Sequence, residues 1–277
     1  MSETGEGDQQ ALARLRERID AVDAEMHRLL NERASVIDEL IRTKQTDRPS
    51  GAFRPGREAD MMRRIVARHR GSLPIFTVEH IWREIITTFT HLQAPFDVTI
   101  DTSIEAERMR DVARFMFGFS VALKSVASAD AVVAAVAAGR NLGIVPRAAW
   151  GPWWRGLVGD QSPKLMALLP FIAARGRPAD LPAFVISPPL ADGVPFDLVA
   201  YALDLDGAAD LPAELGLALA SSGRDVLFAA PRVLSAAELS AGLQSAGVRV
   251  RSAVAVGGFA RGIALGTPAS FLYGPAA

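Results

Sequence analysis

The stretch that decides the fold lies near the N-terminus, over residues 12–40, and reads LARLRERIDAVDAEMHRLLNERASVIDEL. Its apolar side chains recur at steps of three and four residues, which is the spacing of one face of an α-helix. This apolar stripe consists of Leu12, Leu15, Ile19, Val22, Met26, Leu29, Ile37 and Leu40. The pattern therefore predicts a helix of about 30 residues, which is long for a globular domain.

Two shorter helices are predicted to follow. Residues 46–56 (TDRPSGAFRPG) are rich in helix breakers, and a second helix is predicted over 57–69. A third helix begins near Thr77, its expected N-cap. The predicted apolar face of this third helix comprises Val78, Ile81, Trp82, Ile85, Ile86, Phe89 and Leu92. One long and two shorter helices cannot bury so long a stripe against one another, so we expect a homodimer.

Charged residues are unevenly distributed along the chain. They make up roughly a third of residues 1–95 and roughly a sixth of residues 96–277, where alanine, glycine and proline become more frequent. Such a shift in composition is typical of a domain boundary. We therefore predict a multi-domain chain, with an all-α three-helix domain over residues 10–95 and a second domain over residues 96–277.

The second region alternates strand-like and helix-like runs, which indicates an α/β domain with a parallel or mixed sheet. The expected strands lie at residues 97–100, 119–123, 142–146, 184–187, 198–203, 226–229, 249–256 and 262–265. The expected helices of this region lie at residues 104–117, 129–138, 212–221 and 235–246.

Composition excludes several classes of function. The net charge is −1, which gives no electrostatic reason to expect nucleic acid or a membrane surface as a partner. The chain has no cysteine and only four scattered histidines, so we expect no metal site. The N-terminus lacks the pattern of a signal peptide, and no apolar run reaches the roughly 18–20 residues of a membrane span. We therefore expect a cytoplasmic protein.

Two cations lie on the face of the first helix that should be apolar. Arg33 and Lys44 are eleven residues apart, which is close to three turns, so both side chains project from one face about 16 Å apart. A guanidinium on a buried stripe destabilises the fold unless it pairs with an anion. Arg33 in a structural ion pair, or Lys44 extending to solvent at the helix end, remains an alternative.

Three further polar positions add to this set. Arg16 is 17 residues from Arg33 and about 100° away from it around the helix, so it is placed to reach a partner's pocket. Glu58 follows Arg57 in the first turn of the second helix and faces inward, although it could simply complement the helix dipole. Gln93 extends the apolar line of the third helix, or lies at a frayed end.

The chemistry of these groups favours binding over covalent catalysis. They comprise guanidinium groups, an ammonium, an amide and a carboxylate, and we find no nucleophile with a base beside it. Guanidinium groups bind carboxylates through two parallel hydrogen bonds. The set therefore suits a small dicarboxylate and a reaction promoted by positioning and charge stabilisation.

Four segments of the first 95 residues resemble the all-helical chorismate mutases, above all the mutase domain fused to prephenate dehydratase in bacterial bifunctional enzymes. They are Leu15-Arg16-Glu17-Arg18-Ile19-Asp20, Asn31-Glu32-Arg33, Lys44 and Phe53-Arg54-Pro55-Gly56-Arg57-Glu58-Ala59. The resemblance implies an intertwined helical dimer. It also implies a pericyclic conversion of chorismate to prephenate without a cofactor, in phenylalanine and tyrosine biosynthesis.

The resemblance also implies a role for each residue. Arg16 would bind a substrate carboxylate in the partner's site, while Arg33 and Arg57 would bind carboxylates within the subunit. Lys44 and Gln93 would donate hydrogen bonds to the ether oxygen whose bond breaks, so that Lys44, Gln93 and Arg33 form the catalytic set. Glu58 would hold the ring hydroxyl. The chain departs from some family members at two positions, Arg54 and Phe89, which bears on the contacts of the substrate hydroxyl.

The second region resembles a shortened prephenate dehydratase. Residues 129–146 and 182–186 are similar to its first lobe, but Pro182-Ala183-Phe184 stands where the family has Thr-Arg-Phe. Arg147-Ala148-Ala149 stands where Glu-Asn-Ser is expected. We therefore expect no dehydratase activity. Residues from about 196 faintly resemble an ACT regulatory domain, so a scaffold and a regulatory domain with an aromatic amino acid as effector both stay open.

Two other functions stay open for the whole chain. An isochorismate-pyruvate lyase uses the same helical fold and similar cations. A non-catalytic regulatory protein could keep the fold in order to bind an aromatic metabolite.

Overall fold

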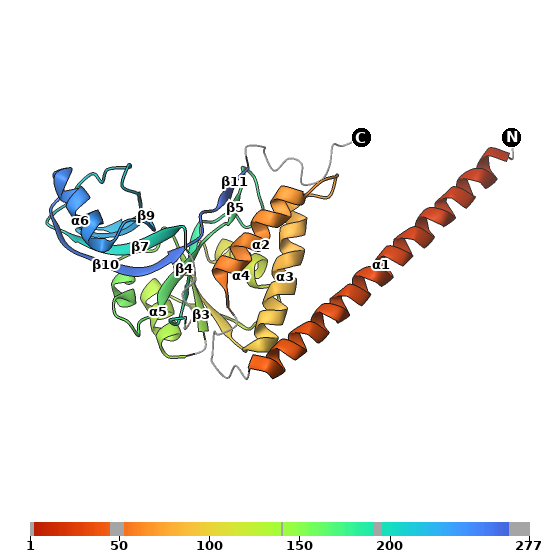
Figure 1. The fold of residues 1–277 in the computed structure, drawn as a ribbon, viewed down its shortest axis with the longest axis horizontal. Coiled ribbons are helices and arrows are strands. Elements are labelled where there is room, and N and C mark those ends of the chain that lie inside the picture. Colours follow the sequence, from red (N-terminus) through yellow and green to blue (C-terminus); the bar gives the residue numbers. More distant parts are fainter. Residues whose placement is uncertain (1–2, 45–52, 140, 191–195, 266–277) are drawn as a thin grey trace. The chain divides into compact units, whose positions relative to one another are not determined.

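A computed structural model describes residues 3–44, 53–139, 141–190 and 196–265 (Figure 1). The chain divides into two compact units, residues 1–46 and residues 47–277. The elements described up to residue 93 are all helices, and the chain beyond is rich in strands, which confirms the predicted multi-domain architecture. The predicted domain boundary between residues 95 and 96 was based on a shift in composition, and it stays a prediction.

The first unit is a single helix, α1 (Glu3–Lys44), of 42 residues. At 1.5 Å per residue it is about 63 Å long. Arg28 braces its surface through ion pairs with Glu25 at 2.7 Å and Glu32 at 2.8 Å. Within the described residues of this unit there is no second element to cover the apolar stripe. Six members of the stripe are exposed to between 48% and 59%: Leu12, Leu15, Ile19, Val22, Met26 and Leu29.

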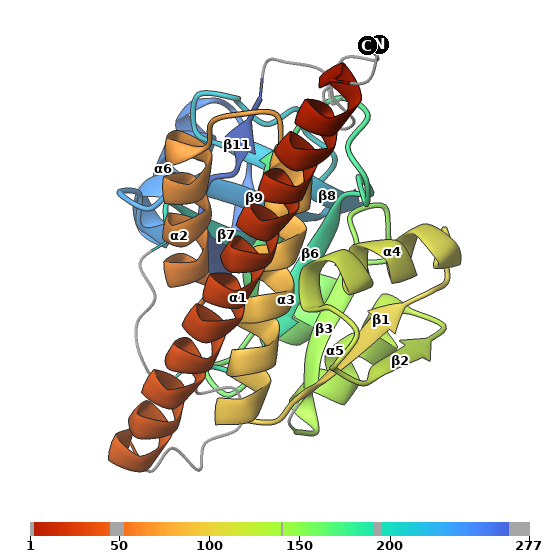
Figure 2. The same cartoon turned by 90° about the vertical axis from the view of Figure 1, so that its right-hand side faces the viewer.

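The second unit begins with two helices that lie side by side, α2 (Pro55–Arg68) and α3 (Ile75–Gln93) (Figures 1 and 2). Pro55 occupies the first helical position of α2, where its missing N–H is not needed. The prediction that Thr77 caps the third helix was wrong. Pro74 is the N-cap, and its carbonyl accepts the Thr77 N–H at 3.0 Å, so Thr77 lies inside the first turn.

The two faces of α3 differ from the prediction. Ile81 and Leu92, from the predicted apolar face, are exposed, whereas Ile86 and Phe89 are buried. The face of α3 that packs inward within this unit is partly polar: Phe76, Glu79, Arg83, Ile86, Thr87 and Thr90 are buried. Thr87 illustrates the packing, since its hydroxyl donates to the carbonyl of Met116 at 3.3 Å.

A nine-stranded mixed sheet forms the rest of the unit, in the order β2-β1-β3-β6-β4-β10-β7-β9-β8. Its strands are β1 (Asp97–Asp101), β2 (Leu123–Val126), β3 (Asn141–Pro146), β4 (Lys164–Leu169), β6 (Ala183–Ser187), β7 (Leu198–Leu205), β8 (Leu217–Ser222), β9 (Asp225–Pro231) and β10 (Val250–Phe259). The strands β1, β2 and β3 are parallel to one another, and β6 runs antiparallel to β3. A separate two-stranded pair joins β5 (Ile172–Ala173) to β11 (Ile263–Ala264).

Helices cover both faces of the parallel strands. Leu142 and Ile144 of β3 pack with α4 (Ala106–Phe117), whereas the alternate residue Val145 packs with α5 (Ala129–Ala137). Because side chains alternate along a strand, α4 and α5 lie on opposite faces (Figure 2). A 3₁₀ turn (Trp153–Leu157) adds two buried tryptophans to the α5 side, and α6 (Ala236–Ser245) begins with a capping box.

The helix predicted over residues 212–221 was wrong, because β8 runs from Leu217 to Ser222 and pairs with β9. Gly216, directly before the strand, accounts for the difference. Its φ is +155°, and a Cβ at this position would lie 2.1 Å from the carbonyl oxygen of Ala229, so only glycine fits. The strand predicted over residues 119–123 was also misplaced, since β2 begins at Leu123.

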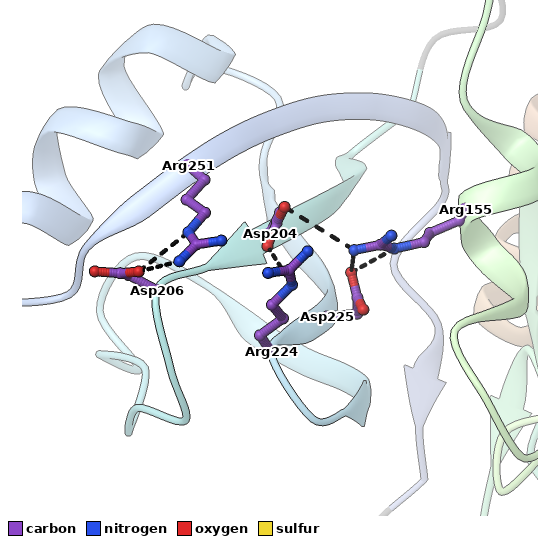
Figure 3. A network of polar contacts seen from close by, with 6 residues as sticks. All are labelled: Arg155, Asp204, Asp206, Arg224, Asp225 and Arg251. Carbon is purple, nitrogen blue, oxygen red and sulfur yellow. Dashed lines mark hydrogen bonds and ion pairs between the residues drawn. The ribbon is translucent and has the colours of Figure 1, made fainter.

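Two separate groups of ion pairs lie around the ends of β7, β9 and β10 (Figure 3). Asp206 pairs with Arg251 and, at 3.2 Å, with Arg249. Asp204 pairs with Arg224 at 3.2 Å, and Arg155 donates to Asp225 at 2.6 Å. The hydrogen bond from Arg251 and the nearby guanidinium charges hold the pKa of Asp206 below its ordinary value.

Replacing Asp206→Asn should therefore destabilise the protein in a pH-dependent way. A carboxyl whose pKa is lowered on folding stabilises the fold above its ordinary pKa, and this contribution is lost as the pH falls through the lowered value. We expect the variant to be less stable than the wild type at pH 7, with the difference shrinking on acidification below the ordinary Asp value of 3.8. Urea denaturation across this range measures it. Asp210→Asn, at an exposed position, is the control, and an equal loss at every pH would contradict the assignment.

Candidate active site

The six predicted site residues all lie on helices, in two groups. Arg16, Arg33 and Lys44 belong to α1 in the first unit, whereas Arg57, Glu58 and Gln93 belong to α2 and α3 in the second. Arg57 and Glu58 are adjacent on α2, and the other four residues lie at separate positions along α1 and α3. The pocket that would join the two groups stays a prediction.

The helix α1 is continuous between its three cations. Arg33 and Lys44 are therefore separated by close to three full turns, and Arg16 lies about 100° from Arg33 around the axis. Arg16 is exposed. Lys44 is the last residue of α1, and its side chain lies outside the described part of the structure.

Glu58 lies inward, as predicted. Its side chain is 12% exposed, and its Oε2 accepts a hydrogen bond from Nη1 of Arg83 at 3.0 Å. Burial raises the pKa of Glu58, while the Arg83 charge and a hydrogen bond from the Arg54 backbone oppose that rise. Its neighbour Arg57 is exposed. The two adjacent residues thus differ in environment, with the carboxylate inside and the guanidinium in solvent.

Gln93 lies ten residues beyond Arg83 on α3, about 15 Å further along the axis. Its Nε2 donates to the carbonyl of Phe89 in the preceding turn, at 2.9 Å. That bond uses one of its two N–H groups, and the amide oxygen is an acceptor besides. The side chain is half-buried at the end of the helix.

Three buried charged residues of this region were missed by the sequence analysis. Arg83 and Glu79 lie one turn apart on the inward face of α3, and Arg177 follows β5. Nη2 of Arg177 lies 3.4 Å from Oε2 of Glu79, and the two side chains are 2% and 3% exposed. Residues spaced four apart normally indicate a surface ion pair, so the helical pattern alone gave no sign of their burial.

A small cavity of about 20 Å³ borders the pair of Glu58 and Arg83. Its other lining residues are Pro55, Ala59, Met116, Met166, Ala167, Leu168, Leu169, Phe171 and Ala260. This volume is enough for about one water molecule and far below the several hundred Å³ of a typical organic-ligand pocket. The cavity is therefore not the predicted dicarboxylate pocket.

The described residues contain neither a metal-binding cluster nor a membrane-spanning helix. No group of three or more His, Asp or Glu side chains in the described ranges could hold a metal ion. Among the helices that the structure describes, none combines the length and apolar character needed to cross a membrane.

Comparison with known families identifies the helical region. Residues 15–94 match the family model of chorismate mutase type II. The match covers α2, α3 and most of α1, and it includes all six predicted site residues. It confirms the resemblance to the all-helical chorismate mutases.

Curated relatives extend the similarity. Bifunctional chorismate mutase/prephenate dehydratases from Stutzerimonas stutzeri and Pseudomonas aeruginosa are 34% and 33% identical over 140 and 144 residues, about half of this chain. The chain spans 38% and 39% of their lengths. Because only 94 residues precede Pro95, both alignments must reach into the α/β region. A third such enzyme, from Neisseria gonorrhoeae, is 35% identical over 83 residues, 30% of this chain and 22% of that protein. No solved structure matches the chain.

The buried pair of Glu58 and Arg83 makes a stability prediction. Arg83→Met leaves a buried carboxylate without its guanidinium, which should lower the free energy of unfolding by about 3–5 kcal/mol. Glu58→Gln added to Arg83→Met should restore part of that loss, because the uncompensated charge is then removed. Urea denaturation of both single variants and the double variant measures the coupling.

Arg108 is the matched control. It is half-exposed in its ion pairs with Glu105 and Asp180, so Arg108→Met should have a far smaller effect. Strictly additive losses for Glu58→Gln and Arg83→Met would show that the two side chains do not depend on each other.

Proposed function

We propose that the chain is a cytoplasmic chorismate mutase, which converts chorismate to prephenate by a cofactor-free pericyclic rearrangement in phenylalanine and tyrosine biosynthesis. The observation that carries the proposal is the family match over residues 15–94, which contains every predicted site residue. Among the curated relatives, three bifunctional chorismate mutase/prephenate dehydratases support it.

The proposed chemistry is electrostatic. Arg33 and Arg57 bind the two carboxylates of the substrate within one subunit, and Arg16 reaches the site of the partner. Lys44 and Gln93 donate hydrogen bonds to the ether oxygen, where negative charge develops as its bond breaks. Donors held in place before the reaction stabilise such charge without further reorganisation. Glu58 accepts a hydrogen bond from the ring hydroxyl.

A homodimer is part of the proposal. The exposed stripe of α1 has no cover within its own unit, and burying each such side chain contributes about 1.5–3 kcal/mol. Ile81 and Leu92 of α3 add further exposed apolar surface. A second copy of the chain supplies a matching stripe and brings Arg16 to the site that it is proposed to serve.

The α/β region is proposed to act as a scaffold without dehydratase activity. Ala183, which stands in place of the arginine of the dehydratase signature, is a fully buried core residue. Arg147 is used structurally, because its guanidinium donates to the backbone carbonyls of Leu219 at 2.9 Å and Ala218 at 3.3 Å. An ACT-like regulatory role from about residue 196, with an aromatic amino acid as effector, is a proposal that inhibition assays would decide.

Lys44→Ala should lower the turnover of chorismate by about 10²–10³-fold in a folded protein, because the variant loses the donor to the breaking ether bond. Loss of chorismate absorbance measures turnover, and circular dichroism shows whether folding survives. Arg33→Ala should mainly raise KM, and Arg33→Lys should rescue poorly because the paired N–H geometry is lost. Wild-type turnover in folded Lys44→Ala protein would end this assignment.

Product analysis separates the alternatives. Phenylpyruvate that appears only after acid treatment indicates a mutase without dehydratase activity, whereas phenylpyruvate before acid treatment contradicts the scaffold proposal. Salicylate and pyruvate formed from isochorismate would identify a lyase. Binding without turnover would favour a regulatory protein.

The dimer proposal predicts that Ile19→Asp yields a monomer, because a charge in the centre of the buried stripe cannot be paired there. The monomer should also lose mutase activity, since Arg16 no longer reaches a partner. Sedimentation velocity measures the assembly. Ala21→Asp, on the opposite side of α1, is the control and should leave the dimer intact. A monomeric wild type would contradict the proposal.

A further inference from the structure

We propose that Arg177 of the α/β region positions Glu58 of the mutase-like helices, through a buried chain of charges that runs from Arg177 to Glu79, Arg83 and Glu58. The inference rests on the proposed function for its kinetic consequence. It makes Arg177 and Arg83 positioning residues, which act on the substrate only through Glu58.

The four charges alternate in sign and are all largely withdrawn from water. Arg177 contacts Glu79 at 3.4 Å, and Arg83 contacts Glu58 at 3.0 Å. Glu79 and Arg83 are one turn apart on α3, where side chains four residues apart are neighbours. Three of the four side chains are at most 3% exposed, and Glu58 is 12% exposed. Each carboxylate thus has its own guanidinium within a neutral set.

Arg177 is the fixed end of this series of buried charges. Its guanidinium lies over the rings of Phe76 at 5.0 Å and Phe115 at 4.9 Å, within the range of a cation–π interaction. It also donates to the backbone carbonyls of Ile172 and Pro178. A guanidinium held by two rings and two carbonyls cannot follow a moving carboxylate, so it fixes the position of Glu79.

Without Arg177 the two carboxylates would compete for one guanidinium. Arg83 forms an ion pair with Glu58 and has a charge interaction with Glu79. An unpaired charge on either buried acid would destabilise the fold. Glu79 would then attract Arg83 and weaken its bond to Glu58. The α/β region therefore determines how firmly Glu58 is held at the start of α2.

Few other charged groups lie near these four buried residues, among the residues that the structure describes. His80 adds a charge interaction with Glu79 and stacks on Phe115, with ring centroids 5.0 Å apart. Asp180 adds a charge interaction with Arg177. Glu58 also accepts a hydrogen bond from the backbone of Arg54. None of these groups supplies a second guanidinium to Glu79 in place of Arg177.

The test compares Arg177→Met with the wild type as full-length protein. We expect the KM for chorismate to rise about tenfold with little change in kcat, since a loosened Glu58 weakens a hydrogen bond to the ring hydroxyl. Adding Glu79→Gln to Arg177→Met should restore most of the KM, because the competing carboxylate is removed. Arg175→Met is the control, because Arg175 is exposed two residues away in the same loop.

A second readout does not depend on turnover. Carbon-13 NMR of labelled glutamate carboxyls, with Glu58→Gln used to assign the Glu58 signal, should show a higher Glu58 pKa in Arg177→Met than in the wild type. An unchanged Glu58 titration would overturn the inference, even if chorismate proved not to be the substrate. Unchanged KM in folded Arg177→Met, beside lost turnover in Lys44→Ala, would overturn it while leaving the proposed function intact.

Discussion

The rest of the second unit depends on how α3 buries charge. Its inward face carries Glu79 and Arg83, and a buried charge without a partner would destabilise the fold by several kcal/mol. Each is matched by a residue from another element, Arg177 after β5 and Glu58 at the start of α2. One pair joins α3 to α2 and the other joins α3 to the loop after β5, and α2, α3 and the α/β region belong to one compact unit.

The long helix α1 follows the opposite logic. Its polar residues pair along the surface, as Arg28 does with Glu25 and Glu32, and nothing within the described residues of its own unit covers its apolar stripe. Such a helix gains stability by packing rather than from its own hydrogen bonds. The proposed dimer meets this requirement, and it also brings Arg16 of one subunit to the proposed site of its partner.

Sequence periodicity predicted the elements whose patterns are regular. The stripe of α1, the three N-terminal helices and most strands of the sheet were found, and so was the inward position of Glu58. The failure at residues 212–221 has a local cause, since alternating alanine and leucine suit a helix or a strand until Gly216 decides between them. Glu79 was missed for a different reason. Its partner Arg177 lies 98 residues away, and no local pattern reports a pairing over that distance.

The two faces of α3 suggest how one helix can serve two regions at once. Its partly polar face packs on the α/β region, where the Thr87 hydroxyl donates to the Met116 carbonyl and Glu79 pairs with Arg177. Its other face keeps Ile81 and Leu92 exposed for apolar packing. Because the two surfaces differ in chemistry, covering one does not compete with covering the other. The α/β region can therefore hold the helices in place without occupying the surface that the proposed dimer needs.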